Sequence, residues 1–144
     1  MEIKKVDSLY CMILYIDTNI VIDAVENRKN VFGKNVGSAA ADLFIRAAGC
    51  AYFLVISDWM LEELAKYKPV SSMTAFFAFI GRKVIRVPYS EEEKRMAKMR
   101  NPLHFQDELH GLIAMREKAD FLVTRNKIDF MHLRMPVRRP EELT

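Results

Sequence analysis

Short apolar runs alternate along this chain with segments whose apolar positions recur every three to four residues. The short runs are rich in aliphatic, aromatic and β-branched side chains, which predict buried strands. The predicted strands cover residues 11–16, 51–56, 84–87 and 121–123, with a further edge strand near 135–137. The longer segments carry helical periodicity or helix-start signals. The predicted helices cover residues 19–26, 39–48, 59–65, 90–101 and 104–118.

Polar residues mark where these helices begin and end. Ser, Thr, Asp and Asn side chains accept hydrogen bonds from the first free N–H groups of a helix. The expected N-caps are Thr18 or Asn19, Ser38, Ser57 or Asp58, and Ser90. Gly49 is expected to end the second helix. Residues 27–37 predict a loop, and residues 125–130 predict a polar loop or the start of a short helix.

Strands that alternate with helices indicate βαβ units and a parallel sheet. We therefore predict an α/β fold. The 144 residues suit one domain, and no repeat or composition change divides them. The N-terminal residues lack the apolar core of a signal peptide, and no apolar run reaches the roughly 18 residues of a membrane span. The expected location is the cytoplasm, with no membrane partner.

Composition adds a mild preference for a polyanionic partner. The net charge is +3, which is the sum of +4 on residues 73–144 and −1 on residues 1–72. The basic residues of 28–34, with Arg82, Lys83 and Arg86, are weak candidates for contacts with an RNA backbone. Cys11 and Cys50 have neither disulfide-framework nor zinc-knuckle spacing, and we interpret them as small buried hydrophobic residues.

Acids and amides stand at predicted strand ends, or on predicted helices that face them, in four places. They are Asp17 with Asn19, Glu62 with Glu63, Asp107, and Asn126 with Asp129. Carboxyl ends of parallel strands meet at one edge of a sheet, where ligands bind in open α/β folds. Carboxylates gathered there suit a hard cation such as Mg²⁺ or Mn²⁺, which activates water and stabilises a leaving phosphate oxygen. The three histidines lack zinc-ligand spacing.

Each acid also has a structural interpretation. Glu62 and Glu63 point about 100° apart on a helix, so at most one faces such a site easily. Asp107 stands near a helix N-terminus, where a carboxylate is favourable without any function. Asp129 is able to close a turn. The joint pattern is therefore more informative than any single acid.

The joint pattern resembles the PIN-domain nucleases, and among them the toxin ribonucleases of VapBC-type toxin–antitoxin pairs. Residues 14–20 (LYIDTNI) resemble the opening strand and its DTN motif, and residues 61–64 (LEEL), after Ile56 and Ser57, resemble the Glu-Leu motif. Residues 106–110 (QDELH) resemble the third acidic motif. Residues 119–130 (ADFLVTRNKIDF) resemble the last strand with its TRN and DF elements, and the end of the chain, 136–143, is also similar. The likeness spans nearly the whole chain.

This resemblance implies a three-layer α/β/α sandwich with a central parallel sheet, as one PIN-like domain over residues 1–144. It implies a metal-dependent endoribonuclease that uses Mg²⁺ or Mn²⁺ and cuts RNA phosphodiester bonds. By position, Asp17, Glu63 and Asp107 would be catalytic metal ligands, and Glu63 is preferred over Glu62 because it directly precedes Leu64.

The remaining positions carry supporting roles in the resemblance. Many family members have Asp where this chain has Asn126, so Asn126 would supply a neutral oxygen and Asp129 the missing charge. Residues expected to support the site by hydrogen bonds are Thr18, Asn19 and Thr124. Arg125 and Lys127 stand beside the site and would hold the substrate phosphate as cations.

The sequence leaves alternative functions, partners and the role of one apolar segment to be considered. A non-catalytic PIN-like module that binds RNA or protein is the first alternative, motivated by Asn126. A haloacid-dehalogenase-type phosphatase is disfavoured, because that chemistry needs a second acid where Asn19 stands. The resemblance implies an antitoxin partner and a homodimer. The apolar residues 73–80 would form the antitoxin groove, a dimer face or ordinary core.

Overall fold

The computed structural model describes residues 11–26, 36–49, 52–67 and 83–143. Within these residues a single sheet runs through the molecule in the order β3-β2-β1-β4-β5, and all of its pairings are parallel. Its strands are β1 (Met12–Ile16), β2 (Tyr52–Ser57), β3 (Val84–Val87), β4 (Phe121–Val123) and β5 (Val137–Arg138). The predicted parallel α/β fold is confirmed.

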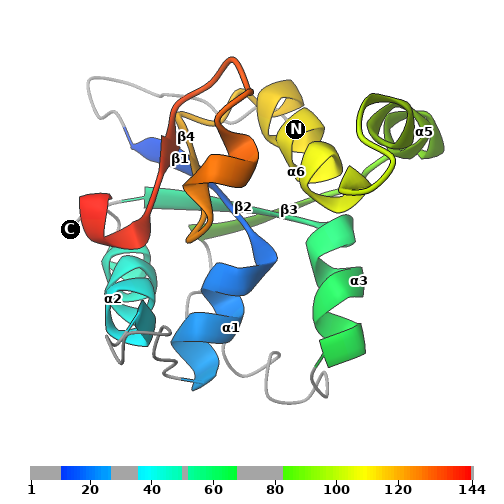
Figure 1. Ribbon diagram of the computed structural model, residues 1–144. Coiled ribbons are helices and arrows are strands. Elements are labelled where there is room, and N and C mark those ends of the chain that lie inside the picture. Colours follow the sequence, from blue (N-terminus) through cyan, green and yellow to red (C-terminus); the bar gives the residue numbers. More distant parts are fainter. Residues whose placement is uncertain (1–10, 27–35, 50–51, 68–82, 144) are drawn as a thin grey trace.

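Helices cover both faces of the sheet and make the three layers (Figure 1). One face carries α1 (Thr18–Glu26), α2 (Val36–Ala48) and α3 (Asp58–Tyr67). The other carries α5 (Glu91–Arg100) and α6 (Phe105–Arg116). Two short 3₁₀ helices, η2 (Lys127–Phe130) and η3 (Pro140–Leu143), follow β4 and β5. The predicted α/β/α sandwich is therefore correct.

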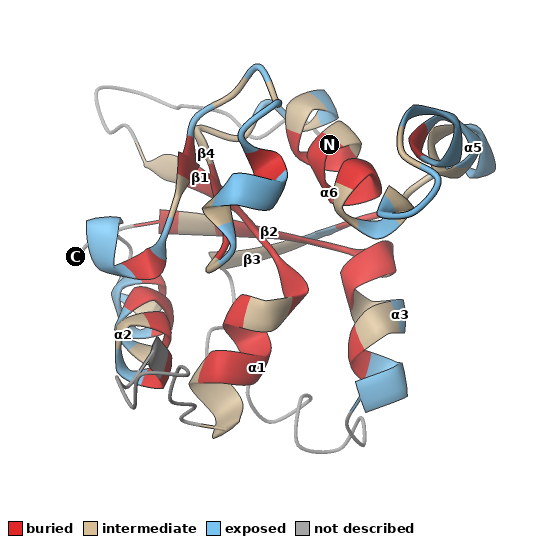
Figure 2. Ribbon diagram, in the orientation of Figure 1, coloured by how far each residue is buried: buried red, intermediate tan, exposed pale blue. Residues whose placement is uncertain are grey.

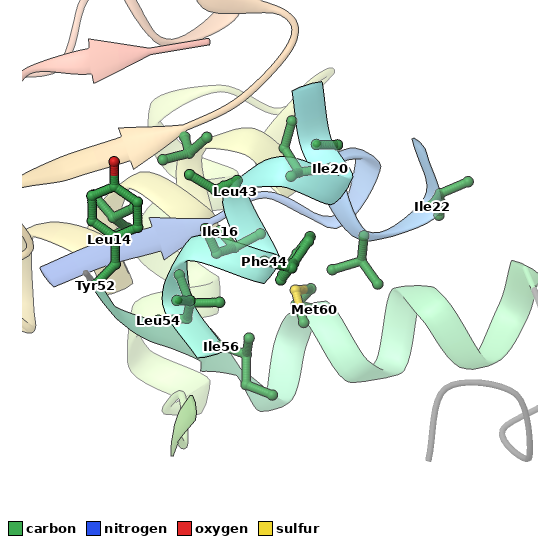
Figure 3. Close-up of a cluster of buried hydrophobic side chains, with 14 of the residues drawn as sticks. Leu14, Ile16, Ile20, Ile22, Leu43, Phe44, Tyr52, Leu54, Ile56 and Met60 are labelled. Atoms are coloured by element: carbon green, nitrogen blue, oxygen red, sulfur yellow. The ribbon is translucent and has the colours of Figure 1, made fainter. Parts of the chain in front are cut away.

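The central strand β1 is buried on both sides (Figure 2), and its residues alternate between two cores. Leu14 and Ile16 pack with α1, α2 and α3, in the cluster drawn in Figure 3. Ile13 and Tyr15 belong to the cluster under α6. Alternation follows from the two-residue period of a strand. Each fully buried aliphatic side chain contributes roughly 1.5–3 kcal/mol, so β1 is firmly anchored and holds the residue that follows it in a fixed position.

Two of the expected helix starts are confirmed with their caps. Ser57 Oγ accepts the Met60 N–H at 3.1 Å, which selects Ser57 over Asp58 as the cap of α3. Ser90 and Glu93 form a reciprocal capping box at the start of α5.

Two other expected caps are wrong. Helix α1 already includes Thr18, whose hydroxyl donates to Glu63 instead of to the helix start. Helix α2 begins at Val36, so Ser38 lies inside it. The capping rule misassigned both residues because it considers only local hydrogen bonds, whereas Thr18 is used by a partner 45 residues away.

Several expectations fall outside the described residues. They concern the apolar segment 73–80, most of the loop 27–37, and Cys50. Cys11 is half-buried. Among the described helices, none has the length and apolar character needed to cross a membrane.

Candidate functional site

Asp17 stands directly after β1, at the point where the order of the strands in the sheet reverses. The chain goes from β1 to β2 on one side, and β4 lies on the other side of β1. Open α/β sheets bind ligands at the carboxyl ends of strands at such a switch point. The Asp17 N–H donates to the Val123 carbonyl at 3.0 Å, which ties the residue to the end of β4.

Thr124 follows β4 and orients the Asp17 carboxylate. Its hydroxyl is fully buried and donates to Asp17 Oδ2 at 2.9 Å. Thr124 Oγ1 also accepts the Asn126 N–H at 3.1 Å, which holds the start of the next turn. Thr124 therefore stabilises one carboxylate oxygen and shapes the backbone that leads to Asn126 and Asp129.

A carboxylate on α3, that of Glu63, contacts residues of α1 and α6 that lie next to Asp17. Glu63 Oε1 accepts the Thr18 hydroxyl at 2.7 Å. The same oxygen lies 2.6 Å from His110 Nε2, and that nitrogen is 3.7 Å from Asp17 Oδ1. His110 thus lies between the two carboxylates, and only 1% of its side chain is exposed.

The other nitrogen of His110 is anchored beneath the sheet edge. His110 Nδ1 is 2.6 Å from the Tyr15 hydroxyl, which is 2.8 Å from Ser57 Oγ. Ser57 in turn caps α3, the helix that carries Glu63. A buried relay of hydrogen bonds therefore runs from the start of α3 through β1 to His110 and back to Glu63.

The electrostatics follow from burial and from this relay. Burial opposes a charge on His110, but its hydrogen bond to Glu63 and the negative charges of Asp17, Glu63 and Asp107 prevail and raise its pKa. Burial would also raise the pKa of Glu63, yet the contacts with His110 and Thr18 lower it overall. For Asp17 burial prevails, and its pKa is raised despite His110 and Thr124.

Asp107, on the first turn of α6, belongs to the same electrostatic cluster. Burial first, then the charges of Asp17, Asp129 and Glu63, raise the pKa of Asp107 to about 6, although His110 acts in the opposite direction. Asp129 is exposed on η2. The charge of Asp129 nevertheless acts on Asp107, so the fourth acid lies near that carboxylate.

We expect Asp107→Asn to stabilise the protein in the absence of divalent cations. A carboxyl group whose pKa is raised on folding favours the folded state below its ordinary value of 3.8, and this contribution is lost as the pH rises through about 6. At pH 7 the substitution should therefore increase the free energy of unfolding by about 1 kcal/mol, after allowance for solvent screening. Urea denaturation at pH 4 and pH 7 measures it. A variant less stable than the parent protein at pH 7 would contradict this account.

The structure separates the two adjacent glutamates. Glu62 is exposed, and its hydrogen bond to Tyr89 raises the pKa of that tyrosine to about 12. Glu63 faces Thr18 and His110. The side chain that adjoins Asp17 is thus the one before Leu64.

Within the described residues, the side chains of two expected site residues, Asn126 and Asn19, make no hydrogen bond to the acids. Asn126 is exposed, and it contacts Thr124 through its backbone N–H and not through its amide side chain. Asn19 is half-buried, and its side chain makes no hydrogen bond within the described part of the chain.

Both cations after Thr124 have carboxylate partners. Arg125 Nη1 donates to Oδ1 of the buried Asp23 on α1 at 3.0 Å. Lys127 Nζ lies 3.2 Å from both carboxylate oxygens of the surface residue Glu142. Arg125 consequently joins η2 to α1, whereas Lys127 makes an exposed pair that contributes little to stability.

Metal binding is a question of donor chemistry here. Within the described ranges, no three acidic, histidine or cysteine side chains are arranged to enclose an ion as they stand. The donors nevertheless fit a hard divalent cation. Asp17, Glu63 and Asp107 offer oxygen ligands. Burial first, and then the negative charges of the other acids, raise the pKa of Asp107, and a cation relieves that repulsion between the acids.

The residue that sequence reasoning missed is His110. In the sequence, His110 is the last residue of the QDELH segment and lacks zinc-ligand spacing, yet it lies at the centre of the acids with Tyr15 and Ser57 behind it. A signal was present: His110 stands three positions after Asp107, so both lie on one face of α6.

Comparison with solved structures agrees with the PIN-like fold. VapC20 of Mycobacterium tuberculosis, a toxin that cleaves the sarcin–ricin loop, is 13% identical with a TM-score of 0.52, over 76% of this chain and 86% of that chain. FitAB bound to the IR36 DNA fragment is also 13% identical, with a TM-score of 0.56, over 88% of this chain and 94% of that one. No protein-family model and no curated protein matches the sequence. The shared property is the fold.

Proposed function

We propose that this protein is an endoribonuclease that hydrolyses RNA phosphodiester bonds with the help of Mg²⁺ or Mn²⁺. The observation that carries the proposal is the meeting of Asp17, Glu63 and Asp107 at the carboxyl edge of the sheet. These acids come from three separate helices or strand ends, and stability alone does not require them to converge. The fold is also that of VapC20, which is described as a toxin that cleaves the sarcin–ricin loop.

Asp17, Glu63 and Asp107 would hold the cation, with Asp129 beside them. When bound, such a cation supplies a reactive water near neutral pH and offsets charge on phosphate oxygens. Thr124 keeps the Asp17 carboxylate oriented, and His110 with Thr18 keeps Glu63 facing it. The buried relay behind His110 excludes water from the back of the site, which strengthens every charge interaction within it.

The direct test is cleavage of a mixed, structured RNA substrate by the purified protein. We expect cutting with Mg²⁺ or Mn²⁺ and none with EDTA. Isothermal titration of the metals should show binding that is weakened in Asp17→Asn. Absence of both cutting and metal binding would contradict the proposal.

We expect Arg125 and Lys127 to differ in their effects. Arg125→Met leaves the buried Asp23 without its guanidinium, so the free energy of unfolding should fall by about 2–3 kcal/mol. Lys127→Ala should leave stability unchanged but weaken RNA binding, and it should reduce the salt slope by about 0.7, the value for one lost phosphate contact on a single strand. Arg46→Ala, an exposed arginine of α2, is the control. Unchanged RNA binding in Lys127→Ala would remove that residue from the substrate site.

We also propose that the protein is the toxin of a toxin–antitoxin pair and forms a homodimer. Support comes from the fold shared with VapC20, which is described as a toxin. Co-expression with the protein encoded by an adjacent gene, followed by sedimentation of the purified species, tests both points. A monomer that no neighbouring gene product binds would contradict both.

A second candidate function is a PIN-like module that binds RNA or a protein without cutting. The exposed Asn126 favours it, because its side chain adds no charge and no contact to the acids. RNA binding that is independent of metal, together with no cleavage, would select this alternative.

A further inference from the structure

A polar cavity lies between the end of α5, helix α6 and the segment that follows η2. Its volume is about 500 Å³, within the range of small-molecule binding sites. It is lined by Arg100 at the end of α5, Glu108 and Met115 on α6, and His132, Leu133 and Arg134 after η2. None of these residues has a role in the site described above.

Two guanidinium groups line this cavity. Arg100 and Arg134 are exposed, and neither has an ion pair or hydrogen bond within the described part of the chain. By contrast, Arg116, Arg125 and Arg139 each pair with a carboxylate. Unpaired guanidiniums that flank a cavity suit a phosphate, which they bind with two parallel hydrogen bonds.

The inner wall combines one buried acid with apolar surface. Glu108 is 5% exposed and contacts His132 Nε2 through Oε1. A carboxylate offers about four lone-pair sites, so this contact leaves acceptor capacity for a ligand. Met115 and Leu133 supply apolar walls, and Leu133 fits closely over α6 because Gly111 has no side chain there.

The cavity and the acid cluster share their supporting elements. Asp107 and Glu108 are neighbours on α6, one in the acid cluster and the other in the cavity wall. Likewise Asp129 acts on Asp107, and His132 pairs with Glu108. A single-stranded RNA that passes over the start of α6 would therefore contact both the cavity and the acid cluster.

We propose that this cavity binds one nucleotide of the RNA substrate near the cleavage position and selects its base. The inference rests on the proposed ribonuclease function. Arg100 and Arg134 bind the phosphate, Met115 and Leu133 contact the base, and Glu108 accepts a hydrogen bond from an amino group. Carboxylates accept from cytosine N4, whereas uracil presents a carbonyl oxygen at that position. Cytidine is therefore preferred over uridine.

The test is titration of the full chain with 5′-CMP and 5′-UMP, followed by NMR or calorimetry. CMP should bind more tightly than UMP by about tenfold, the low end for a specific base contact. The double variant Arg100→Ala with Arg134→Ala should bind both nucleotides at least tenfold more weakly. Glu108→Gln should remove the preference for CMP over UMP while both nucleotides still bind through their phosphates. If Glu108→Gln does not fold, Arg134→Ala alone should weaken the binding of both nucleotides. Arg95→Ala, on α5 outside the cavity, is the matched control.

The outcomes separate this inference from the proposed function. Nucleotide binding that is lost in the arginine variants but retained in Asp17→Asn supports the cavity, even if the protein cuts no RNA. Failure to bind either nucleotide, or equal affinity for both, overturns the base-selecting pocket. Binding of a polyglutamate peptide that the same arginine variants abolish, without nucleotide binding, would overturn it in favour of an acidic protein partner.

Discussion

Asp17→Asn is expected to reduce RNA cleavage at least 10²–10³-fold, the loss typical of removing one central charge-stabilising group. Asp17 lies at the switch point of the sheet and is the acid with contacts to both Thr124 and His110. Asparagine keeps the shape and still accepts the Thr124 hydroxyl, but it carries no charge for a cation. Initial rates at several Mg²⁺ concentrations should show both weaker metal dependence and a lower maximum.

The fold should survive this substitution. Burial raises the pKa of Asp17, so its ionised form is costly in the folded protein, and a neutral amide removes that cost. Asp42→Asn is the matched control, because Asp42 is an exposed acid on α2. Cleavage by Asp17→Asn at the rate of the Asp42→Asn control would remove Asp17 from the active site.

His110→Ala is expected to lower the free energy of unfolding by about 3 kcal/mol or more. The substitution leaves the carboxylates of Asp17 and Glu63 adjacent with no cation between them, and it removes one of the two hydrogen-bond partners of the buried Tyr15 hydroxyl, the other being Ser57 Oγ. Because a divalent cation would restore part of the missing positive charge, added Mg²⁺ should recover more stability in the variant than in the parent protein. Urea denaturation with EDTA and with Mg²⁺ measures both effects.

The pH dependence gives this prediction a second, independent readout. The pKa of His110 is raised on folding, so the charged form stabilises the folded state below the ordinary value of 6.5, and this contribution is lost as the pH rises through the raised pKa. The stability difference between the parent protein and His110→Gln should shrink over that interval. His104→Ala is the control, because His104 is exposed and makes no side-chain cap. Equal stability of the His110 and His104 variants would contradict the central role of His110.

Local sequence was sufficient for most of the fold. Strands β3 and β4 begin and end where their apolar runs do, β1 begins one residue later than predicted, and β2 is shifted by one residue at both ends. These runs are short, rich in β-branched residues and bounded by turn or helix-start signals, so nearby residues suffice to define them. Helix α6 was predicted over residues 104–118 and spans Phe105–Arg116, so the spacing of its apolar residues indicated the helix and its ends shifted by one and two residues.

The sequence also determined which acids to consider, because Asp17 directly follows a strand and Glu63 and Asp107 stand on helices that face the edge of a parallel sheet where ligands bind. Only the tertiary structure decided how those acids are arranged. It directs Glu62 toward Tyr89 and Glu63 toward Thr18, and it places His110 between Glu63 and Asp17. Those partners are 27 to 93 positions apart, and hydrogen bonds and charges act across such separations only once packing has brought the helices together. Residue type and order therefore indicated the chemistry, whereas three-dimensional packing determined the pKa values and the central position of the histidine.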